Sequence, residues 1–392
     1  MGTRFRFLAG LVIPALLCAS ACNTISSSSS SPAGIGALFV ATQGDSSVSA
    51  FSIDLTDGTL TANGKSVATG NTPAAMILAS SGKAVFVANR GTNDISAYTV
   101  QSDGTLTAAS GTQPAGMTPL SMAMDSAGKF LFVANQGLQA DPASGTISVF
   151  TVQGTTLAEV TGSPFRAAAP AAPSGTGPAG VAVTPDGKFL YVANQFDGTV
   201  TAYSVDASGV LTQGLTLPVG TAPSAMAITP DGGFLYVANS STVSAFAICN
   251  QVITSCSDPT SPDGSLTPVA GSPFSAGLGP VSIVVSPSGK FLFVVDRVSN
   301  QVSEYKVATG TGVLTPGTQA TISTGANPVS GTIRVGTTTD ATTGGTLNYL
   351  YVAELGASSI SIYTFDSTVG TLGRVGAPIT ITGGQPSAVA AE

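Results

Sequence analysis

The sequence predicts an all-β protein: a seven-bladed β-propeller built from four-stranded antiparallel blades. Three observations predict it. One phrase of strand-like runs recurs seven times along the 392 residues, and the composition combines 47 Gly and 24 Pro with only 8% charged residues. The last copy also stops after the one strand that the first copy lacks. We expect the propeller to occupy residues 37–392.

The second run of the phrase is its clearest mark. It is short and almost continuously apolar, and it ends on a polar residue. Such runs are typical of strands that are covered on both faces, here by the neighbouring blades. The seven copies are LFVAT (Leu38 to Thr42), VFVAN (Val85 to Asn89), LFVAN (Leu131 to Asn135), LYVAN (Leu190 to Asn194), LYVAN (Leu235 to Asn239), LFVVD (Leu292 to Asp296) and LYVAE (Leu350 to Glu354).

A third and a fourth strand follow in each unit. The third run alternates with period two, as in Thr199 to Val205, and turn residues such as Asp186-Gly187 separate the runs. The fourth run opens with Leu-Thr in most copies, as at Leu60-Thr61. An aromatic residue stands at the centre of every third run: Phe51, Tyr98, Phe150, Tyr203, Phe246, Tyr305 and Tyr363.

The end of the chain is expected to close the ring. The first strand of each unit begins with a proline, and the last of these prolines, Pro386, begins a unit that the chain never completes. The first unit starts at Leu38 with no such strand before it. The C-terminal strand, Pro386 to Glu392, should therefore join the first blade and remove the open ends of the array.

The charge balance argues against a nucleic-acid partner. The chain has 13 Lys and Arg against 20 Asp and Glu. Arg4 and Arg6 lie in a segment that we expect to be removed, which leaves 11 − 20 = −9. Binding to nucleic acid and to anionic lipid surfaces depends on Lys and Arg contacts, so we expect neither surface to be a partner of the propeller.

Residues 1–22 read as an export signal with a lipobox-like end. Arg4 and Arg6 precede the apolar run Phe7 to Leu17, and Ala19-Ser20-Ala21 leads into Cys22. Lipid attachment at Cys22 would hold the protein to a membrane without a spanning helix. Cleavage by an ordinary signal peptidase and an unprocessed segment are the alternatives.

Residues 23–36 are predicted to be a Ser-rich tether, because the serine run from Ser26 to Ser31 has no apolar surface to bury. Asn23 stands where an Asp commonly retains such lipoproteins at the inner membrane. The predicted location is therefore the cell envelope, as an outer-membrane lipoprotein or in the periplasm.

The remaining cysteines fit an exported protein. Cys249 and Cys256 lie in a loop inserted after the fifth copy of the third strand, and we expect them to form a disulfide that closes it. A metal pair is the alternative, but the body has no His and no further Cys as soft ligands. We therefore predict no metal and no cofactor.

The residues after the second strands are predicted to gather at the mouth of the central channel. One interpretation is that the Asn and Asp side chains end the strands and satisfy loop amides. The other is that departures from the repeat, at Arg90, Asp296-Arg297 and Glu354, build a binding site for a small molecule or protein. The candidate ligand-binding residues are Arg90, Asn135, Asn194, Asn239, Asp296, Arg297 and Glu354.

The absence of His excludes several catalytic systems. Ser-His-Asp and Cys-His nucleophiles and a His general base cannot be built from this chain. The sequence also lacks a P-loop and an Asp-x-Asp-x-Asp-Gly calcium loop. Asp296 and Glu354 are the carboxylates at the predicted mouth that are available for acid-base chemistry, and no catalytic residue is assigned.

The repeat resembles a known family of propellers. The phrase Gly-Lys-Phe-Leu-Tyr-Val-Ala-Asn at Gly187 to Asn194, followed by Thr-Val-Thr-Ala-Tyr at Thr199 to Tyr203, is similar to the YVTN-type repeats of seven-bladed lactonase-like propellers. That family includes 6-phosphogluconolactonase. The resemblance covers nearly everything from Leu38 to Glu392, and it implies lactone chemistry with His, Arg and Glu at a channel mouth.

Two functions follow from these observations. The first is a cell-envelope lipoprotein propeller that serves as a ligand-binding or protein-interaction scaffold, held to the membrane by its lipid anchor. The alternative is a lactonase that hydrolyses a sugar lactone at the channel mouth. The missing His favours the scaffold, because the family's expected catalytic set cannot be transferred to this chain.

Overall fold

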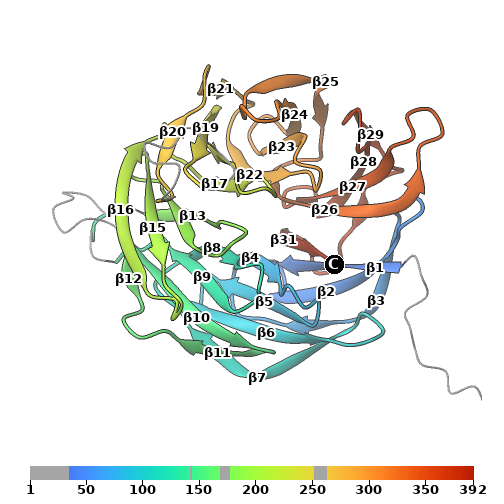
Figure 1. Ribbon diagram of the computed structural model, residues 1–392. Helices are drawn as coiled ribbons and strands as arrows, with labels where there is room; N and C mark the ends of the chain where they lie inside the picture. Colours follow the sequence, from blue (N-terminus) through green and yellow to red (C-terminus); the bar gives the residue numbers. More distant parts are fainter. Residues whose placement is uncertain (1–34, 142–143, 168–176, 251–262) are drawn as a thin grey trace, which may run out of the picture.

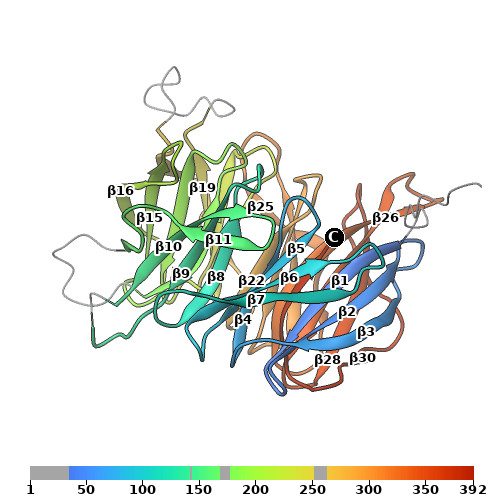
Figure 2. The same ribbon diagram turned by 90° about the horizontal axis from the view of Figure 1, so that it is seen from below.

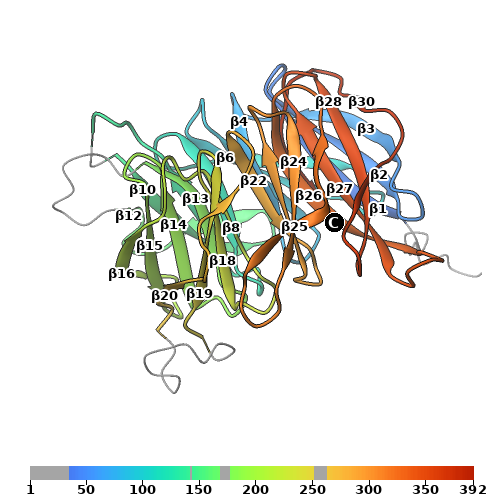
Figure 3. The ribbon, with the colours of Figure 1, turned by 90° about the horizontal axis from the view of Figure 1, so that it is seen from above.

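The computed structural model describes residues 35–141, 144–167, 177–250 and 263–392. Strands form seven antiparallel sheets arranged as blades around a central axis (Figure 1). Seen from the edge, the strands run between the two faces of the ring, so that the connecting turns lie on one face or the other (Figures 2 and 3). No helix occurs among the described residues. The predicted fold is confirmed.

Each blade has the same strand order from the axis outward. The innermost strands are β31 (Pro386–Ala391), β4 (Pro73–Leu78), β8 (Pro119–Met124), β13 (Pro178–Val183), β17 (Ala225–Ile228), β22 (Pro280–Val285) and β26 (Pro328–Thr339). The second strands are β1 (Ile35–Thr42), β5 (Ala84–Asn89), β9 (Phe130–Asn135), β14 (Phe189–Asn194), β18 (Phe234–Ala238), β23 (Phe291–Asp296) and β27 (Thr346–Glu354).

The outer half of each blade is less regular. The third strands are β2 (Ser47–Asp54), β6 (Asp94–Val100), β10 (Thr146–Gln153), β15 (Thr199–Val205), β19 (Thr242–Ile248), β24 (Gln301–Val307) and β28 (Ser359–Asp366). In four blades the outermost strand is continuous: β3 (Leu60–Ala68), β7 (Leu106–Pro114), β16 (Leu211–Pro218) and β25 (Leu314–Ser323). In the other three it is divided in two: β11 (Thr156–Glu159) with β12 (Phe165–Arg166), β20 (Leu266–Pro268) with β21 (Phe274–Ser275), and β29 (Leu372–Arg374) with β30 (Ile379–Thr380).

The C-terminal strand closes the ring as predicted. β31 pairs antiparallel with β1, in a register that sets Leu38 opposite Ala391 and Thr42 opposite Pro386. The Glu392 amide donates to the Ala37 carbonyl at 2.9 Å. We number the blades by the chain order of their second strands, from β1 in blade 1 to β27 in blade 7. β31 is therefore the innermost strand of blade 1, and it lies between β26 and β4 at the centre of Figure 1.

The second strands form the core of every blade. In β5, β9, β14 and β23 every residue is buried, including the polar residue at the end of the strand. Adjacent blades pack through a recurring contact. A glycine with left-handed φ, just before the outermost strand, lies against the second-strand aromatic ring of the preceding blade; Gly264 on Phe189 and Gly370 on Phe291 are examples. A side chain on either glycine would overlap the ring, which explains why the turn requires glycine.

The predictions for the first part of the chain stay predictions. The predicted export signal, Cys22 and most of the Ser-rich tether lie outside the described residues. β1 begins at Ile35, inside the segment predicted as tether. In the described part of the chain, no helix has the length and apolarity needed to cross a membrane. Cys249 is disulfide-bonded, and Cys256 lies outside the described residues.

Candidate functional site

The ends of the second strands and the starts of the innermost strands share one face of the ring, which we call the mouth face. The residue before each innermost-strand proline has a left-handed φ in all seven blades: Thr72, Thr118, Gly177, Ala222, Gly279, Asn327 and Gln385. Five of these are not glycine. Such strained residues cluster where the surrounding structure enforces one loop geometry, which is common at functional sites.

Backbone hydrogen bonds fix the loops of the mouth face. The amide of the residue that follows the second strand donates to the carbonyl of a left-handed residue, as from Arg90 to Thr72 at 3.0 Å and from Arg297 to Gly279 at 2.8 Å. Arg90 and Arg297 therefore occupy equivalent positions in blades 2 and 6. They share a face, with blades 1 and 7 between them around the ring.

The three candidate asparagines are buried inside their blades. Asn135 and Asn194 are 0% exposed and Asn239 is 1% exposed. Each amide nitrogen donates to two hydroxyl groups of the third strand; Asn194, for example, contacts Thr199 at 3.1 Å and Thr201 at 2.9 Å. These amides tie the second strand to the third through side-chain hydroxyls, whereas the structural interpretation of the sequence expected them to satisfy loop amides. A ligand role for them stays a prediction.

Glycines in the connections between blades leave room for these side chains. A Cβ atom on Gly116 would lie 2.5 Å from the Asn135 amide nitrogen, and one on Gly220 would lie 2.8 Å from the Asn239 side chain. The side-chain oxygen atoms of the asparagines differ in their hydrogen bonding. Thr69 donates its hydroxyl to the Asn89 Oδ1 at 2.9 Å, whereas the Oδ1 atoms of Asn135, Asn194 and Asn239 are buried without a hydrogen-bond partner.

Ala115 stands in blade 3 where Thr69 stands in blade 2, since each lies four residues before its proline. Ala115→Thr is expected to stabilise the protein by about 1 kcal/mol, because the new hydroxyl would donate to the orphaned Asn135 Oδ1. Urea unfolding measures the change. Ala115→Val is the matched control, with similar volume and no hydroxyl; equal stabilisation by Val and Thr would contradict the hydrogen-bond explanation.

Asp296 replaces the repeat's asparagine with a carboxylate. It is 0% exposed, and its Oδ2 accepts hydrogen bonds from Ser303 at 2.6 Å and from Gln301 at 3.4 Å, while Oδ1 has no partner. Burial raises the pKa of Asp296 to about 6, and these hydrogen bonds only partly oppose the shift. The group thus changes its charge close to neutral pH.

Glu354 holds the same position in blade 7 but has a balancing cation nearby. Its carboxylate is 0% exposed and accepts hydrogen bonds from the Gly325 amide at 2.6 Å, from Ser359 at 2.6 Å and from Ser361. Arg374 donates to the Ser361 hydroxyl at 3.0 Å. One serine therefore links the guanidinium to the carboxylate. Asp296 has no equivalent cation among its hydrogen-bond partners.

The exposed and half-buried groups of the mouth face are of three kinds. Arg90 and Arg297 are exposed, and neither guanidinium makes an ion pair within residues 35–141, 144–167, 177–250 and 263–392. At the equivalent position in blade 3, Gln136 donates to Gln195 of blade 4 at 2.6 Å. Apolar residues flank Arg297: Leu278 is 57% and Val298 is 61% exposed. Sequence reasoning missed these two, because loop positions carry no repeat pattern.

The first six positions of each innermost strand, counted from its proline, are uncharged, since no Asp, Glu, Lys or Arg occurs there. Serines there join neighbouring blades: the Ser121 hydroxyl accepts the Val181 amide at 3.2 Å, and Ser282 accepts the Gly331 amide at 3.2 Å. Sequence reasoning did not single these serines out, although the Pro-x-Ser pattern was visible. The described residues contain no group of three or more Cys, Asp and Glu able to hold a metal.

A family comparison now identifies the architecture. The family model described as "Lactonase, 7-bladed beta-propeller" matches residues 39–160, 143–253 and 257–390. The chain belongs to this family of lactonase propellers. A search of curated proteins found no match. Family membership fixes the fold, whereas the chemistry depends on the site that each member carries.

Solved structures similar to this lactonase-family propeller are distant in sequence. A "putative 6-phosphogluconolactonase" from Bacteroides uniformis is 20% identical, with a TM-score of 0.72, and the match covers 92% of this chain and all of the other. The periplasmic gluconolactonase of Pseudomonas aeruginosa is 21% identical, with a TM-score of 0.68 and coverage of 91% and 99%. Hydrazine synthase of Kuenenia stuttgartiensis has a TM-score of 0.55 at 16% identity, over 84% and 95% of the two chains. At these identities the likeness shows the fold alone.

Proposed function

We propose that this lactonase-family propeller is a cell-envelope binding protein that takes an anionic, hydroxyl-rich small molecule at its mouth face. One observation carries the proposal: the mouth carboxylates are buried and hydrogen-bonded, whereas the two arginines are exposed and unpaired within the described residues. Arg90 and Arg297 supply charge for a carboxylate or phosphate. Gln136 and Gln195 of blades 3 and 4, on the same face, supply hydrogen-bonding groups for hydroxyls.

The proposal includes export and a lipid anchor at Cys22. The basic and apolar leader and the small residues before Cys22 support it. One structure of the same fold is named as a periplasmic enzyme, which is compatible with an envelope location for such propellers. Mass spectrometry of the mature N-terminus would test the anchor, and an unmodified Cys22 would contradict it.

Lactone hydrolysis is the second candidate function, and Asp296 is the observation that favours it. A carboxylate with a pKa raised to about 6 is a usable general base near neutral pH. The adjacent Arg297 could stabilise the oxyanion that forms when water attacks a lactone carbonyl. The full burial of Asp296 argues against this role, because a base must reach the water that it activates.

One experiment separates the two functions. Gluconate and 6-phosphogluconate are titrated calorimetrically, and hydrolysis of their lactones is followed with the same protein. A binding protein should bind the acids, and Arg90→Ala or Arg297→Ala should lower the affinity about tenfold. The lactones should then hydrolyse no faster than they do in buffer without the protein. Lys65→Ala is the control, since Lys65 is an exposed cation on the outermost strand β3.

A lactonase predicts a different result. Hydrolysis would exceed the buffer rate, rise with pH through about 6 as Asp296 ionises, and fall by about a hundredfold or more in Asp296→Asn. Turnover with this pH profile would reject the binding proposal. Failure to bind either acid, together with no turnover, would reject both functions.

A further inference from the structure

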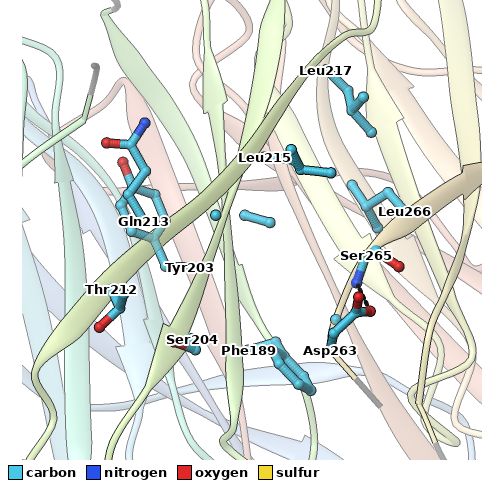
Figure 4. A pocket seen from close by; sticks show the side chains of 13 residues that line it. Phe189, Tyr203, Ser204, Thr212, Gln213, Leu215, Leu217, Asp263, Ser265 and Leu266 are labelled. Carbon is cyan, nitrogen blue, oxygen red and sulfur yellow. Dashed lines mark hydrogen bonds between the residues drawn. The ribbon is translucent and has the colours of Figure 1, made fainter. Parts of the chain in front are cut away.

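A pocket on the rim of the ring lies between blades 4 and 5, away from the mouth-face residues described above. Its volume is about 210 Å³. Leu215, Leu217 and Leu266 contribute apolar surface, and Phe189 lies at the opposite end from Leu217 (Figure 4). Leu215 is 66% exposed, more than any other large apolar side chain among the described residues.

A bulge in the outermost strand creates this space. The pairing of β15 with β16 shifts between Thr201 and Tyr203, so that Gly214 and Leu215 bow outward opposite Ala202. Ala202 and Gly214 carry too little side chain to fill the gap, and both line the pocket. The space therefore follows from a small residue facing a bulge.

Blade 6 has a bulge at the same place, but it is four residues long (317–320) where the bulge of blade 4 has two, and a side chain fills it. The pairing of β24 with β25 shifts between Ser303 and Tyr305, and the residue opposite the bulge is Glu304. The bulge begins at Gly317, where a Cβ atom would overlap the Glu304 carboxylate. The other six copies have Ala, Val or Ile at this position: Ala50, Ala97, Val149, Ala202, Ala245 and Ile362.

Glu304 reaches across to the next blade. Its side chain is 1% exposed, and its Oε2 accepts the Leu372 amide of blade 7 at 3.4 Å. Leu266 is the equivalent of Leu372, because each follows by two residues the glycine that lies against the preceding blade's Phe. The pocket thus lies at the place in blade 4 that the Glu304 side chain fills in blade 6, beside the leucine equivalent to Leu372.

We propose that the seam between blades 4 and 5 binds a small monocarboxylic acid, whose carboxyl group takes the place that the Glu304 side chain fills between blades 6 and 7. The carboxyl group accepts the Leu266 amide, and the aliphatic chain lies on Leu215 and Leu217. Since a cavity of about 150 Å³ holds benzene, 210 Å³ accommodates about eight non-hydrogen atoms. Hexanoic acid has that size.

Asp263 is the one charged side chain that lines this pocket. Its Oδ1 accepts the Ser265 amide at 2.9 Å (Figure 4), and this hydrogen bond holds the pKa of Asp263 below its usual value. A neutral carboxylic acid avoids repulsion from this charge. The titration is therefore carried out at about pH 5, where a simple carboxylic acid is partly protonated.

The test is a methyl NMR titration of the full chain with hexanoic acid. The methyl signals of Leu215, Leu217 and Leu266 should shift together, with a dissociation constant of about 1 mM for a ligand of this size. Ala202→Glu, which gives blade 4 the side chain of blade 6, should weaken binding at least about tenfold. Gln153→Glu is the control, since it adds a charge at an exposed site of blade 3 and should leave binding unchanged.

The reciprocal variant keeps the test decisive if Ala202→Glu does not fold. Glu304→Ala should open a second pocket, and hexanoic acid should then also shift the Leu372 methyl signals, which it leaves unmoved in the wild type. Binding by Ala202→Glu equal to that of the wild type would overturn the proposal. So would leucine signals of blades 4 and 5 that stay fixed at saturating acid, or Leu372 signals that stay fixed in Glu304→Ala.

Discussion

Removing Pro386 to Glu392 is expected to abolish the cooperative folding of the propeller. Without β31, blade 1 loses its innermost strand, and the backbone groups of Leu38 to Thr42 lose their partners on that side. Ala388 and Val389 are also buried, so their apolar contacts disappear. The combined loss is about 5 kcal/mol or more, which is comparable with the whole stability of a typical domain. Urea unfolding followed by circular dichroism should show no sharp transition.

Two controls show whether closure of the ring is the cause. Removing Glu392 alone costs one backbone hydrogen bond, to Ala37, and should leave the transition sharp, because Pro386 to Ala391 still pair with β1. A circular permutant that joins Glu392 to Ile35 through a short linker and opens the exposed turn at Asp103-Gly104 should fold, because it keeps β31 beside β1. A sharp transition in the truncated protein would show that closure contributes little.

Glu304→Gln is expected to stabilise the protein by about 2 to 3 kcal/mol above pH 7 and hardly at all below pH 4. Burial raises the pKa of Glu304 from 4.5 to about 7, although the Leu372 amide and the charge of Lys306 oppose the shift. Because the folded-state pKa lies above the unfolded value, the contribution of Glu304 to the stability of the wild type is greatest below pH 4.5. The wild type loses this contribution as the pH rises through 7, whereas Gln has no charge to bury.

Urea unfolding between pH 4 and pH 8 measures this difference at each pH. Glu159→Gln is the matched control, since it makes the same substitution at an exposed position of blade 3. Its effect on stability should be small and the same at every pH between 4 and 8. A stability difference for Glu304→Gln that does not depend on pH would show that the carboxyl group keeps an ordinary pKa in the folded protein.

The repeat made the fold predictable in detail. The apolar second strands, the seven blades and the joining of Pro386 to the first blade could all be read from one pattern, because each blade buries the same face in the same way. The pattern also marked Arg90, Asp296, Arg297 and Glu354 as departures. It could not say that two of these would be exposed and two buried, since that depends on how each side chain turns at the end of its strand.

The binding features were harder to predict for a physical reason. The rim pocket depends on a bulge, and a bulge is set by the pairing of two strands rather than by either sequence alone. Glu304 was visible as a carboxylate at a position where the other six copies are apolar. Without the neighbouring blade in place, nothing indicated that it would reach the amide of Leu372.

The pairing of the first and last strands also bears on how the protein is made. While the chain is being synthesised, the edge of β1 from Leu38 to Thr42 has no partner until Pro386 to Ala391 have left the ribosome. An unpaired apolar edge invites association with other nascent chains. The ring can therefore close only after β31 has been synthesised, and a chaperone that shields this edge in the meantime would raise the yield of native protein.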